Sequence, residues 1–364
     1  MKPQGPLKGV KILEFVGLGP APFCAMMLSD MGADVVRIDR PGAFGGGAAE
    51  VLARGRRSIA LNMKDEADLA LCREMVAKCE ILLEGYRPGV MERLGLGPED
   101  ALALNPALVY GRMTGWGQTG PLAQAAGHDI NYISLTGALG AIGTPQTPVP
   151  PLNLVGDFGG GAMFLAFGVL AALTHARASG EGQVVDAAII DGATALMASQ
   201  HQLAAMGLWH TRRGENLLDG GAPFYGVYEC ADGGHISIGP LEPQFYALMC
   251  EKLEIDPASM PASWTGEGWG DAKARIAAIF AERTRDEWCD LLEGSDVCFA
   301  PVLNYEESAQ HPHMAAREVY VEVEGVRQAA PAPRFSRTPG AIQGPAPRPG
   351  ADREAILRDW GLNA

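Results

Sequence analysis

Two short segments with few charges hold the residues best suited to proton transfer. His128 lies in GHDINY (127–132) and Asp157 lies in GDFGGG (156–161). An imidazole and a carboxyl can work as a general acid/base pair. Both segments precede apolar helical patterns, where backbone N–H groups and the helix dipole favour negative charge. Taken singly, each residue is more simply explained as structural, with His128 hydrogen-bonded and Asp157 as an N-cap.

A series of arginines in the first third of the chain could bind an anionic ligand. Its members are Arg37, Arg40, Arg54, Arg56, Arg57, Arg87 and Arg93. Arg40 and Arg87 follow the expected ends of strands, which is where open α/β sheets bind ligands. Because Arg recognises phosphate through paired hydrogen bonds, a phosphorylated ligand fits this pattern. Ordinary solvated arginines at loop ends fit it equally well.

Other motifs in the sequence do not indicate a dinucleotide, nucleophile or metal site. Gly17 and Gly19 follow the first expected strand as in dinucleotide sites, but Pro22 stands where a third glycine belongs, so we expect only a tight turn. Neither a P-loop nor a G-x-S-x-G nucleophile elbow occurs in the sequence. The pair in His311-Pro312-His313 lacks a carboxylate pattern, so we predict no metal site. Glu242 opens an expected helix and favours its dipole.

The elements that must position these residues alternate between strand and helix. We expect strands at 10–15, 33–38, 58–61, 81–83 and 108–110, and helices at 22–31 and 65–78. In the second helix Leu69, Cys72, Val76 and Cys79 recur at helical spacing. This alternation predicts an α/β fold with a parallel sheet flanked by helices.

The amino-acid composition changes between residues 111 and 161, which are rich in Gly, Pro, Thr and Asn. So many turn signals indicate a linker or a binding surface, and the aromatics with the isolated His and Asp favour a surface. A buried helix is expected at 162–174 and a strand at 184–190. A long helix and an irregular connection then lead to residue 221.

The later part of the chain has a hairpin pattern at 224–230 and 235–239, followed by helices at 243–253, 271–282 and 285–293. A Pro-rich segment at 331–349 and a short helix at 351–360 end it. We therefore expect a large domain over 1–191, a linker helix and connection over 192–221, a small α+β domain over 222–320, and a C-terminal strap over 321–364 that returns to the large domain.

Composition narrows the class of protein. The chain has 364 residues, 47% hydrophobic and 20% charged, and a formal net charge of −14, which does not favour nucleic-acid binding. The seven cysteines are scattered without C-x-x-C and are expected to be reduced thiols. The first residues lack a secretory signal pattern, and the uncharged stretch 158–174 is expected to be too short and Gly-rich to span a membrane. A cytoplasmic protein without membrane insertion is predicted.

Longer motifs resemble one family. VKILEF, GLGPAP, ADVVRIDRP, EGYRPGVMERLGLG, MTGWGQTGP, AGHDINYISLTG, PLNLVGDFGGG and GQVVDAAIIDG look like the α-methylacyl-CoA racemases, within the family III CoA-transferase-like enzymes. The resemblance runs from about residue 7 to 340. It implies a Rossmann-like, CoA-binding large domain, a small domain, and an interlocked homodimer with each active site between the large domain of one chain and the small domain of the other.

The resemblance also implies roles for residues. His128 and Asp157 match the two catalytic acid/base groups on opposite faces of the substrate's α-carbon. Glu242 matches the position that hydrogen-bonds the catalytic His from the partner chain. The implied coenzyme A contacts are Arg40, Leu61, Asn62, Met63, Lys64, Gly85, Tyr86, Arg87, Arg93, Gly127, Ile130, Asn131 and Tyr132, besides His128 and Asp129. Coenzyme A is then part of the substrate, and no metal, flavin or nicotinamide is required. Residues 42–53 match no motif of the family.

The implied reaction interconverts (R)- and (S)-2-methylacyl-CoA thioesters through an enolate, because a hydrogen α to a thioester is acidic enough to remove. The backbone N–H of Asp129 is a candidate donor to the enolate oxygen. Two alternatives remain open. Asp129 stands where related CoA-transferases have a nucleophilic Asp, so transfer of CoA between acids through an aspartyl intermediate is one. A non-catalytic acyl-CoA-binding protein is the other.

Overall fold

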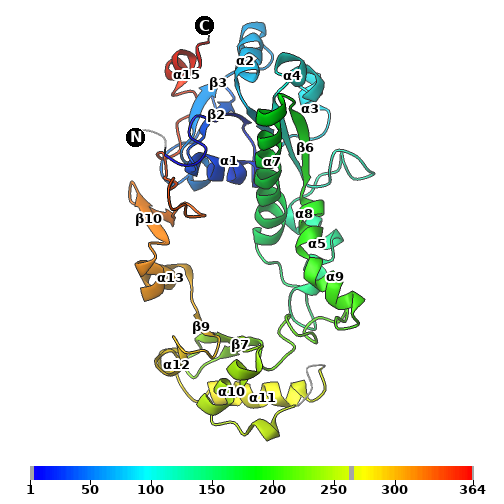
Figure 1. Ribbon diagram of the computed structural model, residues 1–364, viewed down its shortest axis with the longest axis vertical. Helices are drawn as coiled ribbons and strands as arrows, with labels where there is room; N and C mark the ends of the chain where they lie inside the picture. Colours follow the sequence, from blue (N-terminus) through cyan, green and yellow to red (C-terminus); the bar gives the residue numbers. More distant parts are fainter. Residues whose placement is uncertain (1–3, 262–265, 363–364) are drawn as a thin grey trace. The chain divides into compact units, whose positions relative to one another are not determined.

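The computed structural model describes residues 4–261 and 266–362 (Figure 1). Contacts among residues divide the chain into two compact units. Unit 1 comprises the described residues of Met1–Thr136, Leu152–Leu196 and Ala315–Ala364, and unit 2 those of Gly137–Pro151 and Met197–Met314. Residues 137–151, which fall within the large domain expected from the sequence, group with unit 2.

Unit 1 is built on a six-stranded sheet in which every neighbouring pair is parallel. Its strands are β1 (Lys11–Phe15), β2 (Asp34–Asp39), β3 (Arg57–Ala60), β4 (Ile81–Glu84), β5 (Val109–Thr114) and β6 (Gln183–Ala188), in the order β3-β2-β1-β4-β5-β6. The direction of winding reverses between β1 and β4, and ligands of such sheets bind beyond the strand ends near this point. The predicted α/β fold with a parallel sheet is confirmed.

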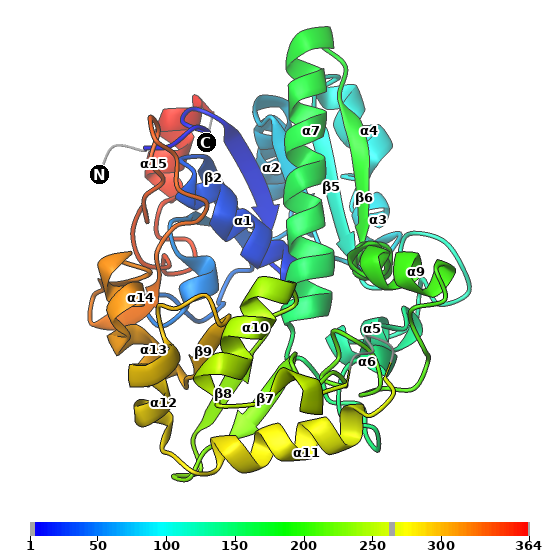
Figure 2. The ribbon, with the colours of Figure 1, turned by 60° about the horizontal axis from the view of Figure 1, so that its bottom comes forward.

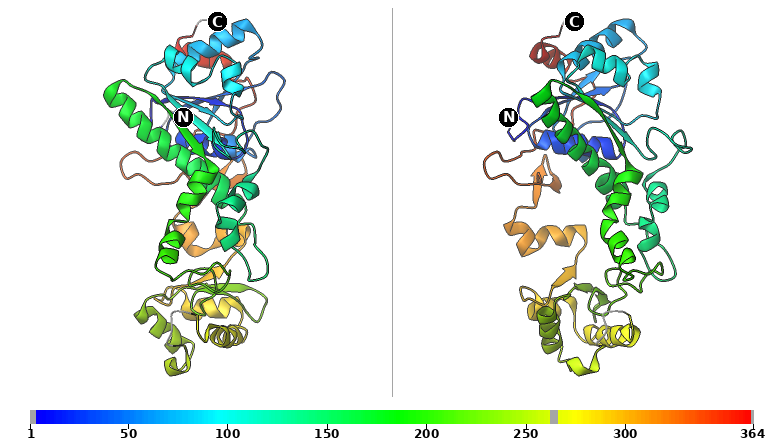
Figure 3. Two further views of the ribbon diagram at one scale, coloured as in Figure 1. Left: turned by 90° about the vertical axis from the view of Figure 1, so that its right-hand side faces the viewer. Right: turned by 45° about the vertical axis from the view of Figure 1, so that its right-hand side comes forward.

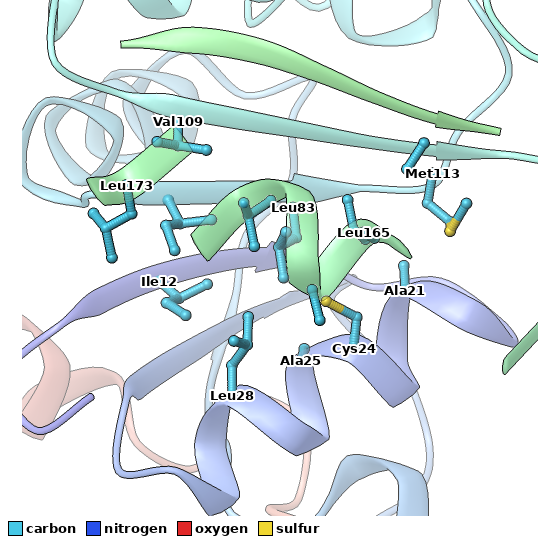
Figure 4. Packing of buried hydrophobic residues seen from close by; sticks show 14 of the residues in the cluster. Ile12, Ala21, Cys24, Ala25, Leu28, Leu83, Val109, Met113, Leu165 and Leu173 are labelled. Atoms are coloured by element: carbon cyan, nitrogen blue, oxygen red, sulfur yellow. The ribbon is translucent and has the colours of Figure 1, made fainter. Parts of the chain in front are cut away.

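Helices cover both faces of this sheet. On one face lie α1 (Pro20–Asp30) and α7 (Phe164–Ser179), and on the other α2 (Glu66–Lys78), α4 (Pro98–Leu104) and α15 (Arg353–Trp360). Figure 2 shows α1 and α7 side by side, with α2 behind the strands. Because successive strand residues point to opposite faces, Ile12 packs under α1 and α7 while Leu13 packs toward α2. In Figure 4, Leu28 lies beside Ile12, and Leu83 and Leu165 belong to the same cluster.

The helix before β6 starts earlier than its apolar pattern predicts. Residues Leu154–Met163 form a wide, π-type helix (η2) that continues directly into α7, so the expected start at 162 is wrong. Its first wide turn is closed by the Phe158 N–H, which donates to the Asn153 carbonyl. Figure 3 shows one continuous green helix alongside β6. Wide turns of this kind are rare and often occur at functional sites.

The glycines of η2 permit a close approach of two backbones. A Cβ on Gly160 would lie 2.6 Å from the backbone nitrogen of Ala193 on α8 (Ile189–Leu196). Within the described residues, the joined helix Leu154–Ser179 is the one stretch long and apolar enough to cross a membrane by length and composition. The expectation that this region is too short is therefore wrong. Its inner face, with Leu165 and Val169, is buried in the core over the sheet, as in core helices of globular domains.

Several short helices occur along the chain, two of them, α5 and α6, in the turn-rich part between residues 111 and 161. They are η1 (Val51–Ala53), α3 (Val90–Arg93), α5 (Asp129–Leu135), α6 (Ala138–Ala141) and α9 (Ala198–Ala205). Where one long helix was expected from residue 192, the chain has α8 and α9 with a break at Met197. Strand β6 ends at Ala188, and α8 begins at the next residue.

Unit 2 contains an antiparallel three-stranded sheet of β7 (Gly226–Glu229), β8 (His235–Ile238) and β9 (Phe299–Val302). The helices after the hairpin are α10 (Pro243–Lys252), η3 (Pro257–Ser259), α11 (Trp269–Phe280), α12 (Arg285–Leu292), α13 (Tyr305–Gln310) and α14 (Pro312–Ala316), the last reaching into unit 1. Phe280 stacks on Tyr228 and meets Trp288 edge-on in their common core. The predicted hairpin is confirmed, and β9 is an additional strand.

The C-terminal part of the chain returns to unit 1. After the hairpin of β10 (Tyr320–Val323) and β11 (Val326–Ala329), an extended segment reaches α15. Gly350 N–H donates to Ser58 Oγ at 2.8 Å, and the Trp360 indole N–H donates to Asp34 Oδ2 at 2.7 Å. The residues that follow the Pro-rich segment are thereby held against β3 and β2.

Candidate active site

His128 stands at the N-cap of α5, directly before the first helical residue. Its backbone is extended, and its N–H donates to Asn131 Oδ1 at 3.0 Å, while the Asn131 N–H returns a bond to the His128 carbonyl at 2.8 Å. This reciprocal pair fixes the start of the helix. The side chain is exposed. The geometry suits a ring that meets a ligand better than one buried for structural reasons.

Asp157 lies in the first turn of η2, half-buried, and not at the N-cap expected from its sequence context. Its carboxylate faces the N-terminus of α1, where Gly19 adopts a φ of +71° as N-cap. A Cβ on Gly19 would lie 3.1 Å from Asp157 Oδ2. The neighbouring Phe158 stacks on Phe23 of α1 at 4.2 Å between ring centroids. The carboxyl is thus held between the wide turn and the start of α1.

The surroundings of Asp157 change its acidity. Burial, reinforced by the negative charge of Asp129, raises the pKa of Asp157 to about 6, and His128 and Asn153 act in the opposite direction. A carboxyl with this pKa is present in both protonation states near neutral pH. General acid/base groups work best when their pKa lies near the working pH.

Asp129 connects the two candidates. It is the first residue of α5, and its Oδ1 accepts the backbone N–H of Asp157 at 2.6 Å. Gly156 is required beside it, since a Cβ there would collide with the same oxygen. The Asp129 carboxylate therefore ties the start of α5 to the turn that carries Asp157.

A cavity of about 410 Å³ beyond β4 and β5 brings together many of the predicted coenzyme A contacts. We call it the His128 cavity. The predicted residues that line it are Gly85, Arg87, Gly127, His128, Asn131 and Tyr132. The Tyr132 hydroxyl donates to the Gly127 carbonyl, and its ring meets Trp116 edge-on at 4.7 Å. Burial raises the pKa of Tyr132, Asp157 raises it further, and Arg87 opposes both, so Tyr132 lies within electrostatic reach of each.

The loop that carries Gly85 to Arg93 is anchored by a buried ionic network that sequence patterns did not reveal. Glu84, at the end of β4, accepts the Tyr86 N–H at 2.7 Å and Arg112 Nε at 2.9 Å. Arg112 also reaches Glu92 on α3 at 2.7 Å. Burial raises the pKa of Glu84 despite these partners. In the sequence Glu84 and Arg112 are single charges in apolar strands, and only strand pairing brings them together.

The other predicted contacts lie outside the His128 cavity. Arg40 is exposed directly after β2, and it opposes the burial that raises the pKa of Tyr86, so these two side chains are neighbours. Asn62 and Lys64 are exposed on the loop after β3, whereas the Leu61 side chain is buried in the core. The remaining members are Met63, which packs on that core, Arg93, exposed on α3, and Ile130, exposed on α5.

Glu242 is the N-cap of α10 in unit 2, and its side chain is exposed. Its contact with His128 stays a prediction. Across residues 4–261 and 266–362, His, Cys, Asp and Glu side chains form no group of three or more that could hold a metal ion.

Comparison with known proteins identifies the family. Residues 7–353 match the model of CoA-transferase family III. The chain is 42% identical to mouse alpha-methylacyl-CoA racemase, over 98% of this chain and 94% of that protein, and 41% identical to the human protein with the same coverage. It is 31% identical to succinyl-CoA--D-citramalate CoA-transferase of Chloroflexus aurantiacus, over 98% of this chain and 94% of that one.

Solved structures have the same fold. A CaiB/BaiF family protein from Brucella suis superposes with a TM-score of 0.83 at 24% identity, covering 98% of this chain and all of that one. A protein from Mycobacterium tuberculosis superposes with a TM-score of 0.82 at 25% identity and the same coverage. The chain belongs to CoA-transferase family III.

Proposed function

We propose that the protein is an α-methylacyl-CoA racemase that interconverts (R)- and (S)-2-methylacyl-CoA thioesters. The relatives named as racemases are 41–42% identical to it, against 31% for the transferase from Chloroflexus aurantiacus. The observation that carries the proposal within the site is the carboxyl of Asp157, whose pKa is raised to about 6 within electrostatic reach of His128. Racemisation requires two acid/base groups, and His128 is the proposed second one.

The proposed mechanism moves two protons. One group removes the α-hydrogen from one face, which leaves a planar enolate whose charge rests on the thioester oxygen. The other group delivers a proton to the opposite face and inverts the centre. In one direction neutral His128 is the base and protonated Asp157 the acid, and in the other direction the roles are exchanged. Each proton transfer typically contributes about 10²–10⁴-fold to the rate.

The enolate oxygen needs hydrogen-bond donors. As the first residue of α5, Asp129 has a backbone N–H without an acceptor inside the helix. This group, at the positive end of the helix dipole, is the proposed donor. Its side chain has the separate role of holding the Asp157 backbone. Asp129 thus serves the reaction without becoming bonded to substrate.

The transferase alternative is less well supported by the site. It requires the Asp129 carboxylate as a nucleophile, whereas one of its oxygens accepts the Asp157 N–H at 2.6 Å. A transferase also has no use for an acid/base group such as Asp157, whose pKa is about 6. An acyl-CoA-binding protein has no use for either.

We propose that coenzyme A enters as part of the substrate, with Arg40 and Arg87 on its phosphates. Both guanidinium groups are exposed beyond strand ends, at the edge where open α/β sheets hold ligands. The chemistry requires no metal, flavin or nicotinamide. The seven cysteines are all free thiols, which fits the proposed cytoplasmic location.

We propose further that two chains form an interlocked homodimer in which Glu242 of the partner chain supports His128. Apolar side chains on the outer face of the helix Leu154–Ser179 support an interface there. Phe167 is 75% exposed, Leu154 58% and Met163 51%. Single exposed apolar residues are common, but several on one helix face mark an interaction surface. Light scattering should give a particle of twice 38.4 kDa, and a fully active monomer would contradict the dimer.

The function is tested with purified protein, a 2-methylacyl-CoA of one configuration, and no acceptor acid. The proposal predicts formation of the other configuration and loss of the α-hydrogen to solvent. If CoA instead passes to an added free acid while the α-carbon keeps its hydrogen, the protein is a transferase. Binding without either reaction would indicate the acyl-CoA-binding alternative.

A further inference from the structure

An aromatic pair joins the wide helical turn that carries Asp157 to the first turn of α1. Phe158, the residue after Asp157, lies in η2, and Phe23 lies in α1. Their rings are nearly parallel, with 4.2 Å between the centroids and 14° between the planes. Rings this close are in direct contact and stabilise each other beyond the area that they bury.

Phe23 extends from the part of α1 that meets the carboxyl. Its N–H donates to the carbonyl of Gly19 one turn earlier, and residues four apart share a face of a helix. A Cβ on Gly19 would lie 3.1 Å from Asp157 Oδ2 and 3.6 Å from its Cγ. Two consecutive residues of η2 therefore contact one face of α1, the first through its carboxyl and the second through its ring.

The start of α1 is itself tied to the sheet. The guanidinium of Arg56 is fully buried, and its Nε donates to Glu14 Oε2 of β1 at 3.1 Å. Its Nη1 donates to the Arg54 carbonyl at 3.0 Å, and its Nη2 donates to the carbonyl of Pro22. Because Pro22 directly precedes Phe23, these bonds fix the backbone that carries the ring. Phe23 is thus a firm support for whatever packs on it.

The η2 side of the contact has few other side chains. Residues 156–161 are Gly-Asp-Phe-Gly-Gly-Gly, so Phe158 is the one bulky apolar side chain among them. Glycines leave a backbone more conformational freedom than other residues do. The Asp129 carboxylate holds the turn through the N–H of Asp157. The stack of Phe158 on Phe23 is a second, independent contact that fixes the same turn.

We propose that Phe23 is a positioning residue, which holds the Asp157 carboxyl against α1 through the stack on Phe158, at its place for proton transfer and away from water. This inference rests on the proposed function, because it concerns the same proton transfer. His128 belongs to the start of α5 and takes no part in the stack. Phe23 should therefore affect only the face of the α-carbon that Asp157 serves.

Replacing Phe23 leaves every charge near Asp157 in place. The titratable groups on the elements packed against η2 are Asp129, Tyr132 and the N-cap His128 of α5, Asp191 of α8, Cys24 and Asp30 of α1, His175 and Arg177 of α7, Tyr110 and Arg112 of β5, and Asp186 of β6. Those that interact with the Asp157 carboxyl are Asp129, His128 and Tyr132. A change in the pKa of Asp157 in a Phe23 variant therefore reports a change in burial.

The first test follows α-hydrogen exchange in heavy water from each configuration of a 2-methylacyl-CoA. The configuration that Asp157 deprotonates is the one that stops exchanging in Asp157→Asn. In Phe23→Ala we expect its kcat to fall about tenfold, with KM changed by less than about twofold, because a displaced group transfers the proton poorly. Exchange from the other configuration should change less than about twofold, since His128 is undisturbed.

Two further variants separate the ring from the general loss of packing. Phe23→Tyr keeps the ring and should restore most of the exchange. Met27→Ala is the matched control, because Met27 lies one turn further along α1 and is partly buried against the same core. This variant loses apolar contacts of α1 without touching the stack, and it should leave the ratio of the two configurations unchanged.

The second test needs no turnover. The carboxyl of Asp157 is titrated by NMR in protein with isotope-labelled aspartate, and Asp157→Asn identifies its signal. In wild type its pKa should be about 6. In Phe23→Ala the pKa should move toward the ordinary value of 3.8, because burial is the largest cause of the rise and water then reaches the carboxyl. Since the base acts when ionised, the acid limb of its exchange profile should move to lower pH as well.

The outcomes distinguish this inference from the proposed function. Equal loss of exchange from both configurations in Phe23→Ala, or the same effect in Met27→Ala, would overturn the inference and leave Phe23 a purely structural residue. An unchanged pKa of Asp157 in Phe23→Ala would overturn it too. If wild type exchanges neither configuration, the proposed function fails, and the titration still shows whether Phe23 keeps the carboxyl buried.

Discussion

The two candidate proton carriers lie in different surroundings. His128 is the N-cap at the start of α5, and its side chain is exposed. Asp157 is half-buried in a wide helical turn, and burial with the nearby Asp129 raises its pKa to about 6. The structure thus places the pKa of this carboxyl near neutral pH, where a general acid/base group works best.

The largest effect on the rate of inversion should come from replacing either His128 or Asp157. His128→Ala and Asp157→Asn should each reduce the rate of inversion by about 10²–10⁴-fold, because one face of the α-carbon then has no acid or base. Inversion is followed by polarimetry or chiral chromatography of the released acid. As a control, both variants should still bind acyl-CoA in calorimetry. A variant that binds normally and inverts at the wild-type rate would remove that residue from the mechanism.

Two variants of Asp129 should give the next largest effect. They separate its hydrogen bond to the Asp157 N–H from its negative charge. Asp129→Asn keeps an oxygen that can accept the Asp157 N–H, whereas Asp129→Ala loses it. We expect kcat to fall roughly tenfold to hundredfold more in Ala than in Asn, as for a lost bond to a charged group. Both remove the charge that raises the pKa of Asp157, so the acid limb of the pH profile should move to lower pH in each. Equal inactivity of the two, with CoA transfer in wild type, would favour a nucleophilic Asp129.

The variant Arg87→Ala tests whether this arginine binds the phosphates of coenzyme A. Arg87→Ala should weaken binding of acyl-CoA about tenfold at low ionic strength, because a paired hydrogen bond to phosphate is lost. The loss should shrink as salt is added, since screening weakens the wild-type contact. Calorimetry with free coenzyme A makes the measurement without the acyl chain. Unchanged affinity at low salt would contradict the assignment.

The smallest expected effect is on stability. The pKa of Asp157 is higher in the folded protein than the ordinary value of 3.8, so ionising it opposes folding. Its unfavourable contribution is absent well below pH 3.8, grows as pH rises through about 6, and remains above that. Asp157→Asn cannot ionise and should be more stable than wild type above pH 6, by about 1 kcal/mol after allowance for partial exposure. Thermal unfolding between pH 4 and pH 8 measures it, and a pH-independent difference would contradict the raised pKa.

Much of the fold could be predicted because its signals are local. The strands of the parallel sheet have buried apolar runs, and the helix expected from residue 65 is α2, with Asp65 as its N-cap accepting two N–H groups of the first turn. The expectation that the segment with His128 precedes a helix is confirmed by α5.

The parts that were missed depend on contacts far apart in the sequence. The glycines of 156–161 are typical of a turn, but here they form a helix because their bare backbone fits against α8. Strand β9, which the sequence analysis did not predict, contains Pro301, and proline is tolerated there because β9 is at the edge of the three-stranded sheet. The same holds for the site. His128 and Asp157 were identified from residue type and resemblance, whereas the link from Asp129 to Asp157 and the pair of Glu84 with Arg112 exist only once the chain is folded.

The most direct test of the account follows α-hydrogen exchange in heavy water from each configuration of a 2-methylacyl-CoA separately. Wild type should exchange both. In His128→Ala, and likewise in Asp157→Asn, one configuration should still lose its α-hydrogen to the surviving base while inversion stops, and the configuration that keeps exchanging should differ between the two variants. Exchange that survives from the same configuration in both variants, or that is lost equally from both configurations, would contradict a mechanism in which His128 and Asp157 serve opposite faces.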